Sequence, residues 1–408
     1  MLFIRLLTAC SVLLNFDLSF SQGVWTQKAN FPAGGREEAI GFNVGMKGYF
    51  GMGTEILGPR HNDMWEYDPV LNTWTPKDSM PGQRRWGAFS FAIGNMGYVG
   101  TGFGSSPYLQ DFWEYNTQNN TWMQKANFGG PGRYSAFGIS IGNKGYAGTG
   151  YTSSGYAQDF YEYDPVLNTW ALKAPFGGGP RQHAAGFTIG NMGYAGTGTN
   201  GTVLADFWKY DPALNTWSLL SPFPGGGRLS PAVFVIGNDG YMGTGWNSTQ
   251  GAIDDFYKYD PLPGTWSPIA NFPTVREGAN FVSIGQKGYV GNGNTGLGPN
   301  YQVDWWEYSP DSILTAGPDP EQNIVSCTVY PNPVTDHLSF VINSGGTSLT
   351  GNSEIKIYNL QGNLVSRDNT CLNTTRFDLH EIPSGVYFFS VSHNGNYVSS
   401  GNFVVVPK

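Results

Sequence analysis

The sequence predicts an all-β protein whose larger part is a ring of repeated four-stranded units. The chain of 408 residues contains 58 Gly, 13 Trp, 23 Tyr and 26 Phe but only 13% charged residues. This composition disfavours disorder and long helices. A tryptophan recurs six times at intervals of 47 to 49 residues, and a Gly-Tyr pair and an arginine recur in step with it. Six such units indicate a six-bladed β-propeller, followed by a smaller β domain.

The first 21 residues have the pattern of an export signal. Arg5 is followed by the mostly apolar run 6–20, and Ser19 and Ser21 are the small residues at the two positions that a signal peptidase reads, so that Gln22 would begin the mature chain. A lipoprotein cleavage box at residues 7–10 is the alternative, although it lies too early for a normal apolar region before it. No other stretch approaches the roughly 20 apolar residues that span a bilayer. The sequence therefore predicts a soluble protein, secreted or held at the outer cell surface, with no transmembrane segment.

Three markers define each repeat. The tryptophans follow Asn-Thr, Gly-Thr or Val and are Trp25, Trp74, Trp122, Trp170, Trp217 and Trp266. The tyrosines of the Gly-Tyr pairs are Tyr49, Tyr98, Tyr146, Tyr194, Tyr241 and Tyr289. The arginines, each 13 residues before a tyrosine, are Arg36, Arg85, Arg133, Arg181, Arg228 and Arg276.

One repeat is interpreted as four short antiparallel strands. Residues 186–189 form the first strand, a turn follows over 190–193, and the Gly-rich run 194–198 forms the second strand. Residues 206–210 alternate aromatic and polar side chains, as a half-buried strand does. An Asp-Pro-x-x-Asn turn then leads to a fourth strand that begins at Trp217.

The two ends of the repeat region predict how the ring closes. The sixth unit stops at Tyr308 without a tryptophan strand, whereas Trp25 lies in such a strand with no unit before it. Residues 24–31 are therefore expected to supply the outer strand of the last blade, within a propeller that spans residues 22–310.

The repeat resembles the kelch family. The carrying pattern is an arginine, then Gly-Tyr followed by glycines, then Tyr-Asp-Pro-x-x-Asn-Thr-Trp, and it covers residues 24–310. The resemblance implies a kelch-type propeller. The usual Gly-Gly doublet is replaced here by Gly-x-Gly, as at residues 148–150, a departure expected to alter local packing only.

The C-terminal part resembles the sorting domain of the type IX (Por) secretion system. Residues 311–323 have the composition of a linker, and residues 324–408 contain the motifs Tyr-Pro-Asn-Pro (330–333), Ile-Lys-Ile-Tyr-Asn-Leu-Gln-Gly (355–362), Ile-Pro-Ser-Gly-Val-Tyr (382–387) and Phe-Val-Val-Val-Pro-Lys (403–408). Strands are expected at 337–342, 354–358, 376–379, 385–391 and 397–405, as a small β-sandwich. The resemblance implies export by the type IX machinery, followed by surface attachment or release.

Charge and cysteine content restrict the other partners. A net charge of −8 with 22 Lys and Arg disfavours nucleic acid, which needs a basic surface. Once the signal is removed, Cys327 and Cys371 remain; they either form one disulfide or stay free, and two cysteines are too few for a zinc site. No metal site, cofactor motif or phosphate loop is expected.

The longer connections of every blade are expected on one face of the ring, which makes the axial mouth on that face the candidate site. The six arginines begin the innermost strands there. Six aspartates begin the third strands on the same face: Asp63, Asp111, Asp159, Asp206, Asp255 and Asp304. Repeated Arg–Asp pairs within the blades are the favoured interpretation, and a cationic ring around the mouth is the alternative.

Ligand specificity is expected where the repeats differ. The residue after each arginine varies: Glu37, Trp86, Tyr134, Gln182, Leu229 and Glu277. The next position adds Glu38 and His183, and the long loops add Tyr108, Tyr151, Tyr156, Trp246 and Tyr301. Aromatic rings beside amides and hydroxyls suit a sugar or a peptide, although each ring can instead pack its own loop against a neighbour.

These features predict an exported binding module that presents the propeller mouth to a glycan or a protein. A carbohydrate-active enzyme resembling an epimerase or a lyase, with Glu37 and Glu277 as its carboxylates and Arg36 or Arg276 beside them, is the alternative, because blades six and one are neighbours. The sequence favours the non-enzymatic function, with no catalytic residue assigned. Copper oxidation is disfavoured, since the propeller holds only His61 and His183 and no cysteine. A spacer without a ligand is a third possibility.

Overall fold

The structure, a computed structural model, describes residues 23–55, 58–106, 108–296, 301–310, 326–343, 353–359, 364–370, 374–380, 382–393 and 396–406. The predicted export signal, the predicted linker, Cys371 and the side chain of Cys327 lie outside this description, so the signal, the linker and the disulfide stay predictions. The chain divides into two compact units, one up to residue 313 and one from residue 314. No helix in the described ranges is both long and apolar enough to cross a membrane.

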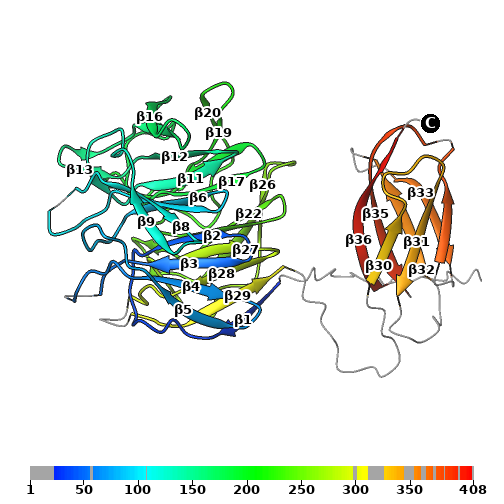
Figure 1. Cartoon of the computed structure of the whole chain (residues 1–408), viewed down its shortest axis with the longest axis horizontal. Coiled ribbons are helices and arrows are strands. Elements are labelled where there is room, and N and C mark those ends of the chain that lie inside the picture. Colours follow the sequence, from blue (N-terminus) through cyan, green and yellow to red (C-terminus); the bar gives the residue numbers. More distant parts are fainter. Residues whose placement is uncertain are drawn as a thin grey trace, which may run out of the picture. The chain divides into compact units, whose positions relative to one another are not determined.

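The larger unit consists of six four-stranded antiparallel sheets (Figure 1). Blade one contains β2 (Ile40–Val44), β3 (Lys47–Gly51), β4 (Met64–Asp68) and β5 (Thr73–Lys77). Blade two contains β6 (Phe89–Ile93), β7 (Met96–Gly100), β8 (Phe112–Asn116) and β9 (Thr121–Gln124). Blade three contains β11 (Phe137–Ile141), β12 (Lys144–Gly148), β15 (Phe160–Asp164) and β16 (Thr169–Leu172). Blade four contains β17 (Ala185–Ile189), β18 (Met192–Gly196), β19 (Phe207–Asp211) and β20 (Thr216–Leu219). Blade five contains β21 (Ala232–Ile236), β22 (Asp239–Gly243), β25 (Phe256–Asp260) and β26 (Thr265–Pro268). Blade six contains β27 (Asn280–Ile284), β28 (Lys287–Gly291), β29 (Trp305–Ser309) and β1 (Val24–Lys28).

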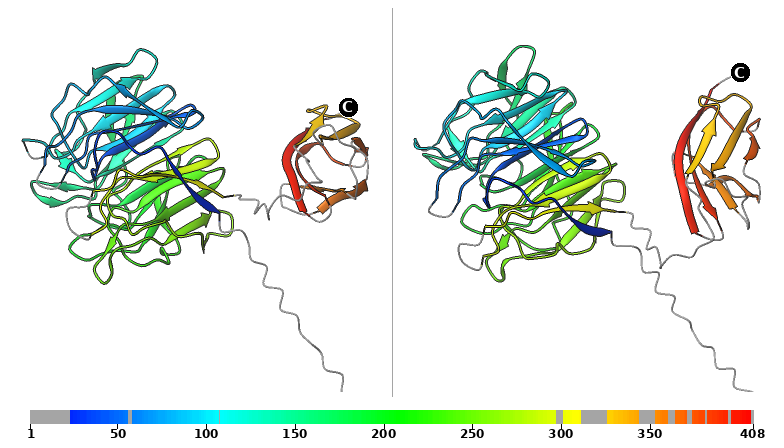
Figure 2. Two further views of the ribbon diagram at one scale, coloured as in Figure 1. Left: turned by 90° about the horizontal axis from the view of Figure 1, so that it is seen from below. Right: turned by 60° about the horizontal axis from the view of Figure 1, so that its bottom comes forward.

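The innermost strands form a closed circle. Strand β2 contacts β6, and the contacts continue through β11, β17, β21 and β27 back to β2. Figure 2 gives two further views of the sheets of this unit. The fold is therefore the six-bladed propeller that the repeats predict, and the last four residues of the Gly-rich second strands are buried.

The second strand of each blade begins two residues earlier than predicted. In blade four Ile189 pairs directly with Met192, so the connection is a two-residue turn rather than residues 190–193. Gly190 has a φ of 58°, a left-handed conformation that two-residue hairpin turns require and glycine adopts without strain.

The Asn-Thr-Trp motif joins each of blades one to four to the preceding blade. In blade one the Asn72 side chain accepts the N–H of Ala29 at 2.9 Å, and Trp74 Nε1 donates to the carbonyl of Ala29 at 2.9 Å. Asn72 has a φ of 54°, and glycine replaces it as Gly264 in blade five with a φ of 70°. The motif thus needs a residue that tolerates the left-handed conformation, and asparagine adds the link between blades.

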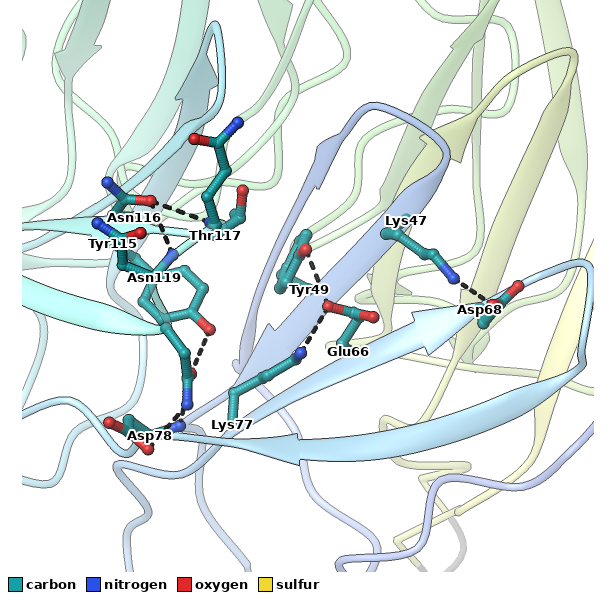
Figure 3. Close-up of polar contacts among 12 residues, drawn as sticks. Lys47, Tyr49, Glu66, Asp68, Lys77, Asp78, Tyr115, Asn116, Thr117 and Asn119 are labelled. Atoms are coloured by element: carbon teal, nitrogen blue, oxygen red, sulfur yellow. Dashed lines mark hydrogen bonds and ion pairs between the residues drawn. The ribbon is translucent and has the colours of Figure 1, made fainter.

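The Gly-Tyr motif contributes a polar contact within the blade. Tyr49 on β3 donates to Glu66 on β4 at 3.0 Å, and Glu66 also pairs with Lys77 on β5 at 2.9 Å (Figure 3). Lys47 on β3 likewise pairs with Asp68 on the adjacent strand β4. These contacts lie between strands of one sheet, so they stabilise the blade rather than form a site.

The N-terminal strand completes the sixth blade. Strand β1 pairs antiparallel with β29, from Val24 opposite Ser309 to Lys28 opposite Trp305. The indole of Trp25 packs against four aromatic rings, and its Nε1 donates to the carbonyl of Ala270 at 3.0 Å. The four rings belong to Phe234, Phe256, Phe272 and Tyr308. Residues far apart in the chain therefore hold the ring closed.

The smaller unit is a two-sheet β domain. One sheet contains β30 (Ser326–Tyr330), β31 (His337–Asn343) and β34 (Thr374–Asp378). The other contains β33 (Leu364–Thr370), β32 (Ser353–Tyr358), β35 (Gly385–His393) and β36 (Asn396–Val405). Strands β30 and β33 were not predicted; the latter carries the largely polar run Leu-Val-Ser-Arg-Asp-Asn-Thr, which lacks a strand pattern. Side chains from both sheets form one core cluster.

Candidate functional site

Each arginine that recurs in the repeat pairs with the aspartate of its own blade. The guanidiniums are at most 1% exposed, and their closest nitrogen lies 2.5 to 2.6 Å from the aspartate oxygen. In blade three Arg133 Nη1 also donates to the carbonyl of Thr149 at 2.7 Å, and the guanidinium covers the ring of Phe128. Thr149 is the middle residue of a Gly-x-Gly run and has a φ of 60°. The arginines are used inside the blades, so the cationic ring around the mouth does not form.

The residues two positions after these arginines surround the axis. All six have a left-handed backbone, with φ between 44° and 63°: Glu38, Gly87, Ser135, His183, Ser230 and Gly278. The backbone N–H of Gly87 donates to the carbonyl of Glu38 at 3.0 Å, and four further links of this kind run from blade to blade. Only two of the six are glycine, so four side chains are held at the axis in a conformation that costs about 1 kcal/mol each.

Three of those side chains meet at the axis. Ser230 Oγ lies 2.7 Å from Glu38 Oε1 and 2.8 Å from His183 Nδ1, and His183 Nδ1 lies 3.3 Å from Glu38 Oε1. The serine donates its single hydrogen to Glu38, so the hydrogen between Ser230 and His183 belongs to Nδ1. We call Glu38, His183 and Ser230 the axial cluster. Because serine and carboxylate share the same ring nitrogen, the cluster lacks the arrangement of a Ser-His-acid triad.

The axial cluster is an ion pair. Burial disfavours the ionised form of Glu38, but the charge of His183 and hydrogen bonds from His183 and Ser230 outweigh it and lower the pKa of Glu38 below 4.5. Burial likewise lowers the pKa of His183, yet the charge and hydrogen bond of Glu38 prevail and raise it above 6.5. Both pKa shifts thus favour a carboxylate beside an imidazolium at the axis.

Stability is expected to depend on pH through this pair. The raised pKa of His183 contributes stability that is complete below pH 6.5 and is lost as pH rises through the folded-state value. The lowered pKa of Glu38 contributes stability above pH 4.5 that is lost as pH falls. His183→Gln should therefore destabilise more near pH 5.5 than near pH 9, measured by urea unfolding. An equal loss at both pH values would contradict the ion pair.

Above the axial cluster lies a cavity of about 450 Å³, here called the mouth cavity. On the other side of the axial cluster lies a smaller axial cavity of about 140 Å³, lined by the inner strands of five blades and, in blade five, by the two residues before the inner strand. Glu38, His183 and Ser230 line both cavities, so the axial cluster separates them. The remaining walls of the mouth cavity are Glu37, Thr54, Glu55, Trp86, Leu229, Glu277, Gly278 and Tyr301.

Two further carboxyl groups in the mouth cavity have raised pKa values. Burial, followed by the charge of Glu38, raises the pKa of Glu37 to about 7, although Tyr301 donates to its Oε1 at 3.0 Å. Burial and the charge of Glu38 also raise the pKa of Glu277. Near neutral pH Glu37 is therefore present in both protonation states and can donate as well as accept a hydrogen bond.

The structure distributes the predicted site residues over three places. Glu37, Trp86, His183, Glu277 and Tyr301 line the mouth cavity. The predicted tyrosines Tyr108, Tyr134 and Tyr156, together with Tyr151, pack in an aromatic cluster that continues from Trp86 and Phe103. This cluster includes the short strands β10 (Arg133–Tyr134), β13 (Tyr151–Thr152) and β14 (Gly155–Tyr156).

Two predicted residues lie away from the cavity. Trp246 lies on the hairpin of β23 (Trp246–Asn247) and β24 (Gly251–Ala252), outside the cavity wall. Gln182 is not in the wall either; its Oε1 is buried without a hydrogen-bond partner among the described residues. Neither residue is brought to the mouth.

Sequence reasoning missed Ser230, Thr54 and Glu55 as site residues. Ser230 occupies the repeat position of Glu38 and His183, so the comparison of repeats contained a signal for it. Glu55 follows the Gly-x-Gly run of blade one and accepts from His61 Nε2 at 3.0 Å, a contact without any sequence signal. No group of three His, Cys, Asp or Glu side chains in the described ranges is placed to hold a metal ion.

Comparisons with known proteins agree with both units. Residues 77–232 match the KLHDC2/KLHL20/DRC7 kelch-repeats domain, and residues 328–406 match the secretion system C-terminal sorting domain. No curated protein matches the chain. The solved structure titled "Structure of YjhT" superposes with a TM-score of 0.59 at 15% identity over 67% of this chain and 95% of that one, which shows a shared fold alone. The chain is thus a kelch-repeat propeller joined to a type IX C-terminal sorting domain, which implies secretion.

Proposed function

We propose that this secreted propeller binds a saccharide in the mouth cavity. One observation carries the proposal: an indole, four carboxyl groups and a phenol hydroxyl line a single cavity of about 450 Å³. That volume lies within the usual range for small-molecule sites. An aromatic face suits the apolar C–H face of a sugar ring, while Glu37, Glu277 and Tyr301 suit its hydroxyl groups.

The electrostatics of the mouth favour a neutral ring over an anionic one at this position. Glu37, Glu38, Glu55 and Glu277 lie around the same space, and His183 is the one lining residue that can carry a positive charge. Because Glu38 already pairs with His183, an anion in the cavity would meet uncompensated carboxylates. A hydroxyl group has no such penalty, and the partly protonated Glu37 can act as its donor or acceptor.

Trp86→Ala is expected to weaken saccharide binding at least tenfold, about 1.4 kcal/mol. The full chain is first screened on a glycan array, and the saccharides that bind are titrated by calorimetry. Trp246→Ala serves as the matched control, because Trp246 lies on the same face outside the cavity, and should bind within twofold of the wild type. Equal binding by wild type and Trp86→Ala would overturn the proposal, as would an array without any bound saccharide.

A second candidate function is a carbohydrate-active enzyme of epimerase or lyase type. The observation that favours it is the pKa of Glu37, raised to about 7 beside Glu277, because a carboxyl group that titrates near neutral pH suits proton transfer. The saccharide found by the array would be incubated with the protein and followed by NMR. A binding module returns it unchanged; turnover that Glu37→Gln or Glu277→Gln abolishes would establish the enzyme.

A further inference from the structure

A second hollow adjoins the mouth cavity between blades one and two. It has a volume of about 630 Å³ and is here called the outer groove. Thr54, Glu55 and Trp86 line both the outer groove and the mouth cavity. The two spaces therefore share one wall, and a chain-like ligand with one unit in the mouth would place its next unit in the outer groove.

Two arginines of the outer groove have no carboxylate partner. Arg60 and Arg84 both line it, and among the described residues neither makes a hydrogen bond or an ion pair. The other cations of the propeller contrast with them. Six arginines pair with aspartates, and every described lysine of the propeller except Lys209 has a carboxylate within 4 Å. In a chain of net charge −8, two of the three cations that lack a carboxylate partner in the described part of the propeller thus lie in one hollow.

The groove holds one of these cations in place by ring contacts. The guanidinium of Arg60 lies over Phe103 at 5.0 Å, and Phe103 stacks on Trp86 at 5.3 Å. Stacking leaves the N–H groups at the edge of the guanidinium plane free to donate. The one carboxylate of the groove, Glu55, already accepts from His61 at 3.0 Å.

A neutral donor accompanies the arginines. Gln83 Oε1 accepts from Ser105 Oγ at 2.8 Å and from the N–H of Ser106 at 3.3 Å, which fixes the amide and leaves its Nε2 hydrogens as donors. The outer groove thus collects donors with positive charge, whereas the mouth cavity collects carboxyl groups. The two halves of the site are complementary to different parts of one ligand.

We propose that the outer groove binds the carboxylate or sulfate group of a saccharide unit next to the one in the mouth cavity. The ligand is then an acidic oligosaccharide whose neutral ring contacts Trp86 and whose anion lies between Arg60 and Arg84. Guanidinium groups match both carboxylate and sulfate oxygens with paired N–H bonds. This inference rests on the proposed saccharide binding and adds the class of saccharide and its orientation.

The test compares anionic oligosaccharides with matched neutral ones. The full chain is titrated with an oligosaccharide in which one glucuronate unit is linked to a neutral hexose and with its methyl ester, which differ only in the carboxylate. It is also titrated with a galactan oligosaccharide that carries a single sulfate and with its unsulfated counterpart. The wild type is expected to bind an anionic member at least tenfold more tightly than its neutral counterpart, and the series that binds identifies the anion. Arg60→Gln/Arg84→Gln should remove that preference and retain neutral binding within twofold. Lys209→Gln, the third unpaired cation, is the control and should leave the preference intact.

The outcomes separate this inference from the proposed function. If the wild type binds the anionic and neutral oligosaccharides with equal affinity, the proposal of an acidic ligand is overturned. The same conclusion follows if Arg60→Gln/Arg84→Gln still binds the anionic oligosaccharide more tightly than the neutral one. If Trp86→Ala still abolishes binding in that case, the saccharide site stands and only the outer groove fails. If Trp86→Ala binds as the wild type does, both proposals fail. Unchanged melting temperatures of the variants confirm that any loss comes from the ligand contact.

Discussion

Arg133→Met should lower the free energy of unfolding by about 3 kcal/mol, the low end of what breaking a buried ion pair costs. The guanidinium is fully buried, whereas Asp159 is 26% exposed and can partly recover its hydration. Methionine keeps the volume of the side-chain stem, so the loss reports the polar contacts of the guanidinium. These are the two bonds to Asp159, the bonds to the carbonyls of Thr149 and Pro131, and the contact with the ring of Phe128.

Urea unfolding of the full chain measures this effect. Arg84→Met is the matched control, because Arg84 is exposed and unpaired, and its effect should stay within about 0.5 kcal/mol. A loss below 1 kcal/mol for Arg133→Met would mean that the repeated arginine does not stabilise the blade, and its role as a ligand group would need to be reconsidered.

Trp25→Ala should destabilise the propeller by about 3 kcal/mol and open it at one place. Removal of a large aromatic side chain from a packed cluster costs this order of free energy, and Trp25 contacts four rings of blades five and six. Because β1 is the outer strand of blade six, its loss also leaves β29 with an unpaired edge.

Hydrogen exchange shows where Trp25→Ala opens the propeller. Amides of β1 and β29 should exchange faster in Trp25→Ala, while those of β11 and β12, on another part of the ring, keep their protection. Val24→Ala is the control, since Val24 is 39% exposed on the same strand. A uniform rise in exchange over all six blades would show that loss of the Trp25 contacts destabilises the whole propeller rather than releasing β1 from blade six.

The repeats made most of the fold predictable. Six repeats of one period predicted six blades, and the missing tryptophan strand after Tyr308 indicated that Trp25 belongs to the last blade. The turn at Gly190 was predicted too long, because a two-residue turn and a four-residue turn leave the same Gly-Asn-Met-Gly signature in the sequence. The small hairpins of the long loops, such as β13 and β14, interrupt the repeat and carry no periodic signal.

The site was predictable only in part. Glu37 and Glu277 follow the repeated arginines of neighbouring blades, so a common wall could be expected from the order of the blades. Contact between Glu38 of blade one and His183 of blade four depends on the width of the ring at its axis, which no local pattern encodes. The raised pKa of Glu37 depends on its burial and on the charge of Glu38. Arg60 and Arg84 can be recognised as unpaired only from the ion pairs that most other cations of the propeller make in the structure.

A crystal structure of the full chain with the saccharide that binds best on the array tests the central claim most directly. The account predicts the sugar in the mouth cavity, with one ring against Trp86 and its hydroxyl groups within hydrogen-bond distance of Glu37 or Glu277. Saccharide density on the opposite face, on the outer strands, or on the sorting domain with the mouth cavity empty would contradict it.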